Sequence, residues 1–337
     1  MKRIITLISL VSITATSLDA ASLTNNTTND SLSNKKLIET TLNPTKNVAF
    51  KHLDLGVTLG SGGVGLDLAT PITSFLKLRA GVEFMPQFCV PMTFNLQSYS
   101  ITEGVSSNFE RMQEMMYEFT GIEADETVKM KGKPDMINFK CLFDFSPWSD
   151  KGWHFTVGFL YGSHRIASAE NYTSEAATLL GVKMFNNMHD YFISEEYMDN
   201  PFPVLGYIDP EVGDAAKQKF INYGRIGVHV GDYKDTGTPY LMEPGEDGMV
   251  KVRAYVNRFK PYLGFGYGGP VSKDKRLNLS FDAGIIYWGT PKVLTHEGVD
   301  LINDLENVTG KVGTYVDIFN AMKVYPEINF RISYTLF

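Results

Sequence analysis

The sequence predicts an all-β fold, an eight-stranded antiparallel transmembrane β-barrel with long, partly helical extracellular loops. Three observations support this prediction. The last residues, Tyr325 to Phe337, alternate strictly between apolar and polar side chains and end on an aromatic residue. Such alternation gives a strand one apolar and one polar face. Seven earlier runs alternate in the same way, and short and long connections follow one another in the order that a membrane barrel requires.

Residues 1–20 are expected to be a secretory signal peptide. Lys2 and Arg3 form a basic start, an apolar stretch follows, and Ala20 lies at the expected cleavage site. The alternative is an uncleaved membrane anchor. The apolar run is shorter than the ~20 residues that a spanning helix needs, so the signal peptide is favoured.

The chain beyond the signal peptide divides into a linker and a barrel. Residues 21–48 are rich in Asn, Thr and Ser, which predicts a flexible periplasmic linker. Residues 49–337 are expected to form the barrel. Its long loops are predicted at about 87–135, 167–249 and 290–323.

The first three strands are predicted to follow one another closely. Every second residue is apolar in 53–59, in 64–69 and in 76–84. The turns between them, 61–63 and 71–74, contain glycine or proline and serine. This spacing predicts two hairpin connections at the start of the barrel.

The next strands are predicted in two further pairs. Residues 137–145 and 153–161 alternate on either side of a turn with proline and glycine, and so do 259–267 and 277–287. Residues 250–256 also alternate, but their apolar positions have the opposite parity to those of 259–267. Either a bulge resets the register there, or 250–256 is a separate strand. The strand count of eight or ten depends on this point.

The connections provide an independent argument. They are short at 61–63, 71–74, 146–152 and 268–276, and long at the three predicted loops. With eight strands, all three long loops fall on one side and both termini fall on the other. Transmembrane barrels have this asymmetry.

The choice between a membrane barrel and a soluble one depends on which face is outside. The polar face is rich in glycine, which allows close approach inside a narrow barrel. Aromatic residues occur near strand ends, as they do at membrane interfaces: Trp153, Tyr267, Tyr287, Trp288 and Tyr334. The apolar face is therefore predicted to contact lipid.

The polar face then lines the lumen, and its opposite charges nearly cancel. An eight-stranded barrel is just wide enough for its own side chains. Unpaired buried charge is costly, so we expect these charges to pair and plug the lumen. The alternative is that some of them lie above the membrane in water. The predicted lumen network comprises Asp54, Asp67, Lys77, Arg79, Glu83, Lys140, Asp144, Arg258, Lys260, Asp282, Glu327 and Arg331.

Residues 258–293, followed by a strand to the C-terminus, resemble small outer-membrane barrels of the OmpA/OmpW-like kind, especially uncharacterised members from Bacteroides-type bacteria. Pro261-Tyr262-Leu263-Gly264 and Phe281-Asp282-Ala283-Gly284 carry the resemblance. It implies a fold and an outer-membrane location and brings no catalytic residues. Such barrels usually end Tyr-x-Phe on the lipid face, whereas Phe337 here lies one step beyond Leu336.

The long loops contain helical patterns. One stripe combines Phe109, Met112, Met116 and Phe119, and a second runs from Val299 through Val312, Val316 and Phe319. These stripes pack on the protein itself, or they form a surface for a partner or ligand, to which methionine adapts well. Long loops of this kind are commonly functional.

Few residues suggest catalysis, metal binding or redox chemistry. Ser163 and His164 are adjacent in a strand and so point to opposite faces, which disfavours a nucleophile–base pair even with Glu170 nearby. His189-Asp190, Glu195-Glu196 and Asp232 show no ligand spacing. Cys89 and Cys141 form one disulfide or remain two buried thiols. We therefore expect no enzyme, catalytic residue, metal or cofactor.

The predicted function is that of a non-enzymatic outer-membrane protein, structural or binding through its outer loops, with a plugged lumen. A channel for small solutes is the alternative, and a lipid-modifying enzyme is a weaker one. The expected partners are outer-membrane lipid, the barrel-assembly machinery through the C-terminal strand, and an extracellular ligand or protein. The net charge of −7 argues against nucleic acid.

Overall fold

The structure is a computed structural model that describes residues 49–148, 152–194, 210–308 and 310–337. The predicted signal peptide, residues 1–20, and linker, 21–48, lie outside the described residues. No helix in the described part of the chain has the length and apolar character needed to cross a membrane.

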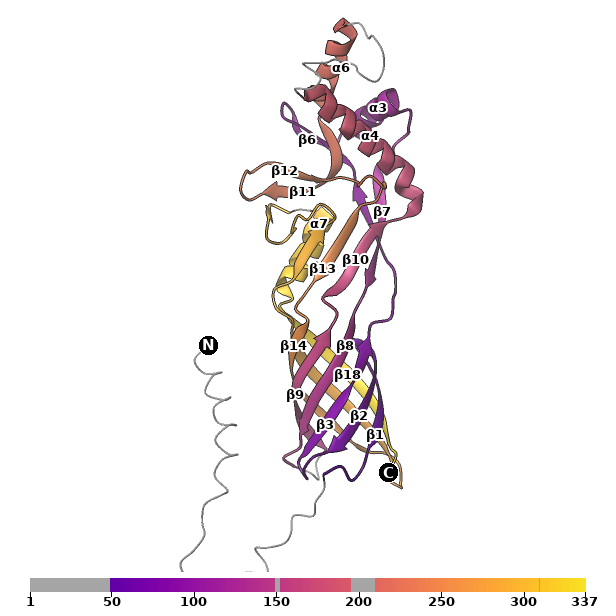
Figure 1. Cartoon of the computed structure of the whole chain (residues 1–337), viewed down its shortest axis with the longest axis vertical. Helices are drawn as coiled ribbons and strands as arrows, with labels where there is room; N and C mark the ends of the chain where they lie inside the picture. The colour runs from indigo at the N-terminus through magenta and orange to yellow at the C-terminus, as the bar shows by residue number, and fades with distance from the viewer. Residues whose placement is uncertain (1–48, 149–151, 195–209, 309) are drawn as a thin grey trace, which may run out of the picture. The chain divides into compact units, whose positions relative to one another are not determined.

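Eight antiparallel strands close into a barrel, in the order β1-β18-β15-β14-β9-β8-β3-β2 (Figure 1). The first strand pairs with the last, with Asp54 opposite Thr335, which closes the barrel. The predicted fold class and eight strands are confirmed. The strands are β1 Asp54–Gly60, β2 Gly63–Pro71, β3 Leu76–Phe84, β8 Ile137–Phe145, β9 Trp153–Gly162, β14 Phe259–Pro270, β15 Leu277–Tyr287 and β18 Val324–Thr335.

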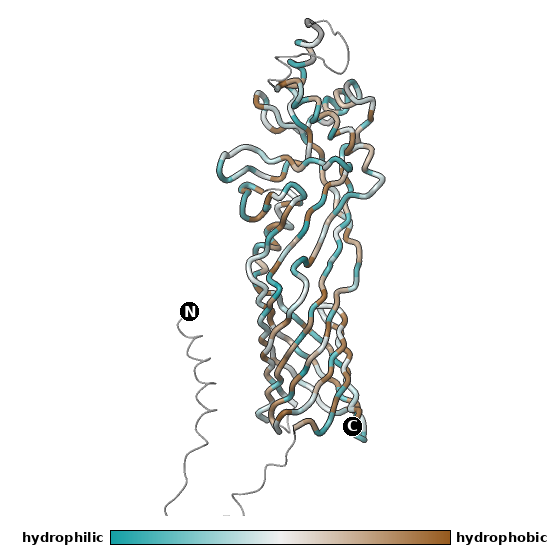
Figure 2. Tube along the Cα trace, in the orientation of Figure 1, coloured by the Kyte–Doolittle hydropathy of each residue, from teal (hydrophilic) through white to brown (hydrophobic). Residues whose placement is uncertain are grey.

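The barrel strands expose their apolar side chains and bury their polar ones. The exposure pattern of β18 alternates along the strand, and Figure 2 shows the matching alternation of hydropathy in the barrel wall. Phe330 and Ile332 are exposed, whereas Arg331 between them is buried. A soluble barrel would have the opposite pattern, so an apolar outer face indicates a wall that contacts lipid.

A second sheet continues the barrel wall on the side of the long connections. Its order, β16-β13-β10-β7-β4, repeats the order β15-β14-β9-β8-β3 of the barrel strands that it adjoins in sequence. Five of the eight barrel strands are therefore extended, while β1, β2 and β18 are not. The strands of this outer sheet are β4 Val90–Asn95, β7 Thr127–Pro134, β10 Arg165–Asn171, β13 Lys251–Tyr255 and β16 Lys292–Thr295.

Strand β13 settles the ambiguous run at 250–256. It is a separate strand that pairs with β10 and β16 in the outer sheet, and it does not add to the barrel count. The parity of the alternation changes between β13 and β14 because the two belong to different sheets, whose interiors have different chemistry.

Further out, a third sheet packs with helices. It has the order β12-β11-β5-β6, and β17 pairs with β11. The amide of Asn186 in α4 binds the backbone of Ile226 in β11 through two hydrogen bonds, at 2.8 and 2.9 Å. The elements are β5 Gln97–Ser100, β6 Gly104–Ser106, α3 Phe109–Thr120, η1 Thr173–Glu175, α4 Ala176–Ile193, α6 Pro210–Tyr223, β11 Arg225–Tyr233, β12 Pro239–Met242, β17 Leu305–Glu306 and α7 Gly310–Ala321.

The two predicted helical stripes differ in outcome. Met112 and Met116 of α3 are buried in the core, so these methionines pack on the protein itself. The second stripe becomes a helix only from Gly310. The residues before it do not continue the helix because Leu305 pairs with Tyr233 of β11 as part of a strand. Strand pairing across the sheet overrides the local helical spacing.

The two cysteines are free. Cys141 is half-buried on the outer face of β8, and Cys89 is exposed before β4. The disulfide that the sequence left open is absent from the structure, and the alternative of two buried thiols is wrong for Cys89.

Candidate functional site

The predicted lumen charges lie on the inner face of the barrel, with one exception. Arg258 is exposed and precedes β14, so its assignment to the lumen is wrong. The alternation that placed it inside does not extend beyond the first residue of the strand. Lys77 lies at the mouth on the short-turn side, where its ammonium is 2.9 Å from Asp54.

Arg79 forms the centre of the lumen network. Its guanidinium is 2.9 Å from Asp144 and 3.3 Å from Asp282, on two other strands. Thr156 donates a hydrogen bond of 2.8 Å to Asp144, and His154 Nε2 lies 2.7 Å from Asp282. Each carboxylate therefore has a charged partner and a further polar one, as buried ion pairs require.

The outer half of the lumen also buries charged side chains, and of its two lysines Lys140 is paired with carboxylates whereas Lys260 binds neutral oxygens. Lys140 contacts Glu83 directly and lies 3.9 Å from Glu327. Lys260 donates hydrogen bonds to Asn138 and to the carbonyl of Ser163, at 2.8 and 3.0 Å.

Arg331 and Asp67 form a further pair, joined at 3.0 Å through Nε. A Cβ placed on Gly56 would lie 2.5 Å from the Arg331 guanidinium. The glycine therefore provides the space that this large side chain occupies, as the glycine-rich polar face predicted.

A polar cavity of about 190 Å³ opens at the short-turn end of the barrel, and its lining includes Lys77, Trp148 and Arg79. It thus leads to the central arginine and the carboxylates bound to it.

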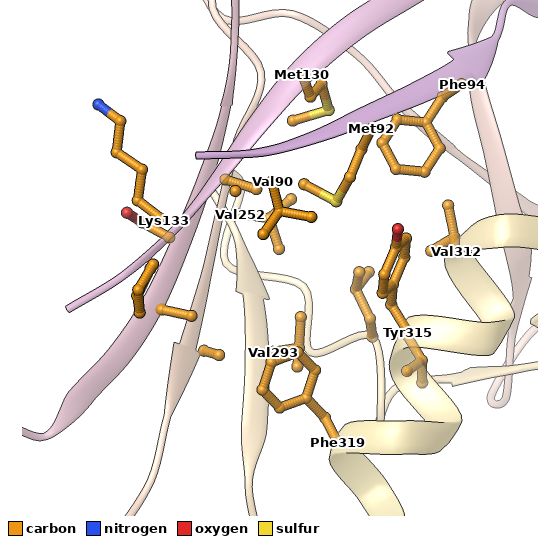
Figure 3. Close-up of a pocket in the computed structure, with 18 of the residues that line it drawn as sticks. Val90, Met92, Phe94, Met130, Lys133, Val252, Val293, Val312, Tyr315 and Phe319 are labelled. Carbon is orange, nitrogen blue, oxygen red and sulfur yellow. The ribbon is translucent and has the colours of Figure 1, made fainter. Parts of the chain in front are cut away.

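A second cavity has the opposite character. It has a volume of about 300 Å³ and lies between the outer sheet and α7 (Figure 3). We call it the outer cavity. Its lining is almost wholly apolar and comes from every strand of the outer sheet, from β12, from α7 and from two connecting segments that contribute Phe88 and Leu301. The other lining residues are Val90, Met92, Phe94, Met130, Gly132, Lys133, Pro134, Ala167, Ser168, Ala169, Met242, Val252, Ala254, Val293, Val312, Tyr315, Val316 and Phe319.

The outer cavity lies on the inner side of the outer sheet, which has five strands and does not close into a barrel. Helix α7 occupies the side left open, and it contacts β16 at one edge of the sheet. Three residues that line the cavity are nevertheless exposed: Phe88 and Val90 at the β4 edge of the sheet, and Tyr315 on α7. The cavity therefore opens between β4 and α7.

A polar cavity of about 260 Å³ adjoins the outer cavity. The two share Phe94 and Val312 in their linings. We call the second one the polar annex. Its other lining residues are Thr93, Asn95, Gln97, Ser107, Val228, His229, Gly310 and Lys311.

A charged cluster joins α4 to the third sheet. Arg225 binds Glu243 at 2.6 Å through Nε and also contacts Asp190, which lies 3.1 Å from His189. Burial lowers the pKa of His189 because it disfavours the cation. Burial opposes ionisation of Asp190, yet the hydrogen bonds from Arg225 and His189 lower the pKa of its carboxyl.

The catalytic and metal candidates are not brought together. Ser163 Oγ accepts a hydrogen bond of 3.0 Å from the backbone of Ile137, whereas His164 Nδ1 contacts the carbonyl of Val256. Glu170 lies near Lys131, at 3.3 Å. The described ranges contain no group of three potential metal ligands, and Glu195-Glu196 lies outside them.

No protein-family profile and no curated protein matches the sequence. The solved structures that are similar at low identity include the following three. Acinetobacter baumannii CarO2 is 12% identical with a TM-score of 0.35, over 84% of this chain and 98% of that one. CarO from the same organism is 13% identical with a TM-score of 0.34, over 84% and 96%. A major outer membrane protein from Thermus thermophilus is 10% identical with a TM-score of 0.31, over 85% and 98%. Likeness this remote says nothing of what this chain binds.

Proposed function

We propose that this chain is a non-enzymatic outer-membrane protein of the OmpA/OmpW-like kind that binds an apolar ligand in its outer cavity. The Bacteroides-type affinity is part of this proposal. The observation that carries the proposed function is the apolar lining of a cavity of about 300 Å³ outside the barrel. The extracellular ligand expected from the sequence thus gains a site and a chemical class.

The size and chemistry of the cavity support binding. Small-molecule sites are concave, mostly apolar and of about 300–1,000 Å³. In another protein, an engineered apolar cavity of only about 150 Å³ stays free of water and binds benzene. Leaving the outer cavity unfilled costs van der Waals contacts along its whole wall, so an apolar molecule that fills it would bind favourably.

Binding can be measured with the uncharged fluorescent probe N-phenyl-1-naphthylamine, on protein in lipid nanodiscs with empty discs as the blank. Ala254 is 4% exposed and lines the outer cavity, so Ala254→Phe should fill it and abolish the excess fluorescence. The same substitution at Ala283, which faces outward on β15, is the control and should leave binding unchanged. Equal binding by both variants would contradict a site in the outer cavity.

We also propose that the lumen does not conduct solutes. The paired charges around Arg79 and Lys140 support a plugged barrel over the channel alternative. Single-channel recording in a planar bilayer tests this, after a heat-modifiability gel has shown that the barrel is folded. Silence is expected, and stable ohmic steps would make the protein a pore.

The remaining partners belong to the same proposal. The apolar outer face of the barrel suits outer-membrane lipid, and the exposed end of the chain at Leu336 and Phe337 suits the barrel-assembly machinery. Deleting Phe337 should slow barrel assembly in cells without changing the heat-modifiable form of protein that has folded. Normal assembly kinetics would remove the C-terminus from the list of recognition features.

A further inference from the structure

We infer that the natural ligand is a single-chain amphiphile with an anionic headgroup, whose alkyl chain occupies the outer cavity and whose headgroup occupies the polar annex beside Lys311. This inference rests on the proposed function and narrows the ligand class. It is carried by the adjacency of an almost wholly apolar cavity and a partly polar one.

The first step is adjacency. The outer cavity and the polar annex share Phe94 of β4 and Val312 of α7 in their linings, so the two cavities are neighbours on either side of these side chains. Figure 3 shows Phe94 and Val312 on one side of the outer cavity. A linear molecule that extends past these two side chains would reach the annex from the outer cavity.

The second step is the polarity of the annex. Asn95, Gln97 and Ser107 bring amide and hydroxyl groups to its wall, and Gln97 donates a hydrogen bond of 2.9 Å to Ser107. The polar residues that line the outer cavity are Ser168, Tyr315 and Lys133. The ammonium of Lys133 lies 3.6 Å from Glu170, so it already has an anionic partner within the protein. A polar headgroup is better satisfied in the annex than anywhere in the outer cavity.

The third step is charge. Lys311 lines the annex and is exposed, and its ammonium lies 3.3 Å from the carbonyl of Thr93, which leaves further donors for an anion. Among the described lining residues of the annex there is no Asp or Glu. Asp232 lies 3.7 Å from His229 Nε2 and is also bound by Asn307 at 2.9 Å, so it interacts with the protein itself. The annex therefore favours an anion and disfavours a cation.

The test compares decyl compounds that share a chain and differ in headgroup: decanoate, decyl phosphate, decanol and decyltrimethylammonium. Each competes with N-phenyl-1-naphthylamine for protein in nanodiscs, with empty discs correcting for partition into lipid. The nanodisc sample must be free of residual alkyl detergent, because detergent carried over from purification would occupy the site before the test compounds are added. The anionic compounds should displace the probe at concentrations about two- to fivefold below that of decanol, the preference that a solvated ion pair supplies. The stronger of the two anions identifies the headgroup.

Lys311→Glu should remove this preference and leave displacement by decanol unchanged. Lys292→Glu makes the same change at an exposed residue of β16 outside the annex and should keep the preference. Equal displacement by all four compounds, or a preference that survives Lys311→Glu, would overturn the inference while the apolar site stands. Failure of Ala254→Phe to block the probe would instead remove the proposed function.

Discussion

The barrel lumen and the outer cavity are two interiors of one chain, and they are built on opposite principles. The lumen buries charged side chains from the inner faces of the barrel strands and fills the space with ion pairs around Arg79 and Lys140. The outer cavity buries apolar side chains from strands that continue the same wall and leaves about 300 Å³ unfilled. A single wall thus reverses its polarity where it leaves the lipid.

The difference follows from what surrounds each part. Lipid contacts the apolar face of the barrel, so the polar side chains face inward and must form hydrogen bonds and ion pairs with one another. Water surrounds the outer sheet, so its apolar face turns inward instead. Charges in a narrow barrel must be paired closely, which fills the middle of the lumen and leaves a polar cavity toward its short-turn end. An apolar interior can retain a cavity at moderate cost. The comparison therefore leads us to propose that the lumen contributes stability and that the outer cavity binds the ligand.

The largest expected effect is loss of the central arginine. Arg79→Ala leaves Asp144 and Asp282 buried without their shared cation. Removing one partner of a buried pair costs about 3–5 kcal/mol, so the free energy of unfolding should fall by that amount. Urea titration of the barrel in lipid vesicles measures it. Arg258→Ala, at the exposed position, should change it by less than about 0.5 kcal/mol. If Arg79→Ala lowered the free energy of unfolding as little as Arg258→Ala does, the lumen charges would be solvated and the buried network would be contradicted.

A smaller effect is expected from overfilling the lumen. A Cβ on Gly284 would lie 2.5 Å from the hydroxyl of Tyr262, which is 3% exposed inside the barrel. Gly284→Ala should therefore cost about 1–3 kcal/mol of the free energy of unfolding. Tyr262→Phe removes the hydroxyl but keeps the ring carbon Cζ, which would lie 2.6 Å from the new Cβ, so it should recover only a small part of the loss. Gly269→Ala, where nothing lies within 4 Å, is the control. A neutral Gly284→Ala would mean that the lumen has free space.

The smallest expected effect is a dependence of local stability on pH in the outer helices. The pKa of His189 lies below its ordinary value of 6.5, so the unfolded chain binds this proton more tightly. Stability of α4 on β11 is then lost as the pH falls below 6.5. The lowered pKa of Asp190 adds a loss below its ordinary value of 3.8. Hydrogen exchange corrected for intrinsic rates should show less protection in α4 at pH 5 than at pH 7.5, and His189→Gln should flatten this change. Protection that is equal at the two pH values in the parent chain would contradict it.

The barrel was predictable from the sequence because lipid imposes period-two alternation on every strand that crosses it. Strand β15, for example, has the predicted bounds, Leu277–Tyr287, and its alternation identifies Asp282 as a residue that faces the lumen. Arg258 marks where this reasoning fails, because parity has no meaning beyond the end of a strand. Which charges pair could not be predicted, since Arg79 meets Asp282 across 203 positions of sequence.

The outer cavity was not predictable from local pattern. Its strands are short, and β7 contains Gly132 and Pro134, which weaken the alternation. Its lining joins segments from Phe88 to Phe319, and only the order of the barrel strands brings them together. One signal was present: Val312, Val316 and Phe319 formed a predicted apolar stripe, and this stripe lines the cavity. What it faces required the structure.

The most direct test of a binding site outside a plugged lumen is to locate a bound ligand. A crystal structure with a decyl ligand brominated at its far end would place the bromine by anomalous scattering. We expect a peak in the outer cavity, near Met92, Val252 and Phe319, which disappears in Ala254→Phe. A peak inside the barrel, or peaks on its lipid-facing surface alone, would contradict a binding site in the outer cavity.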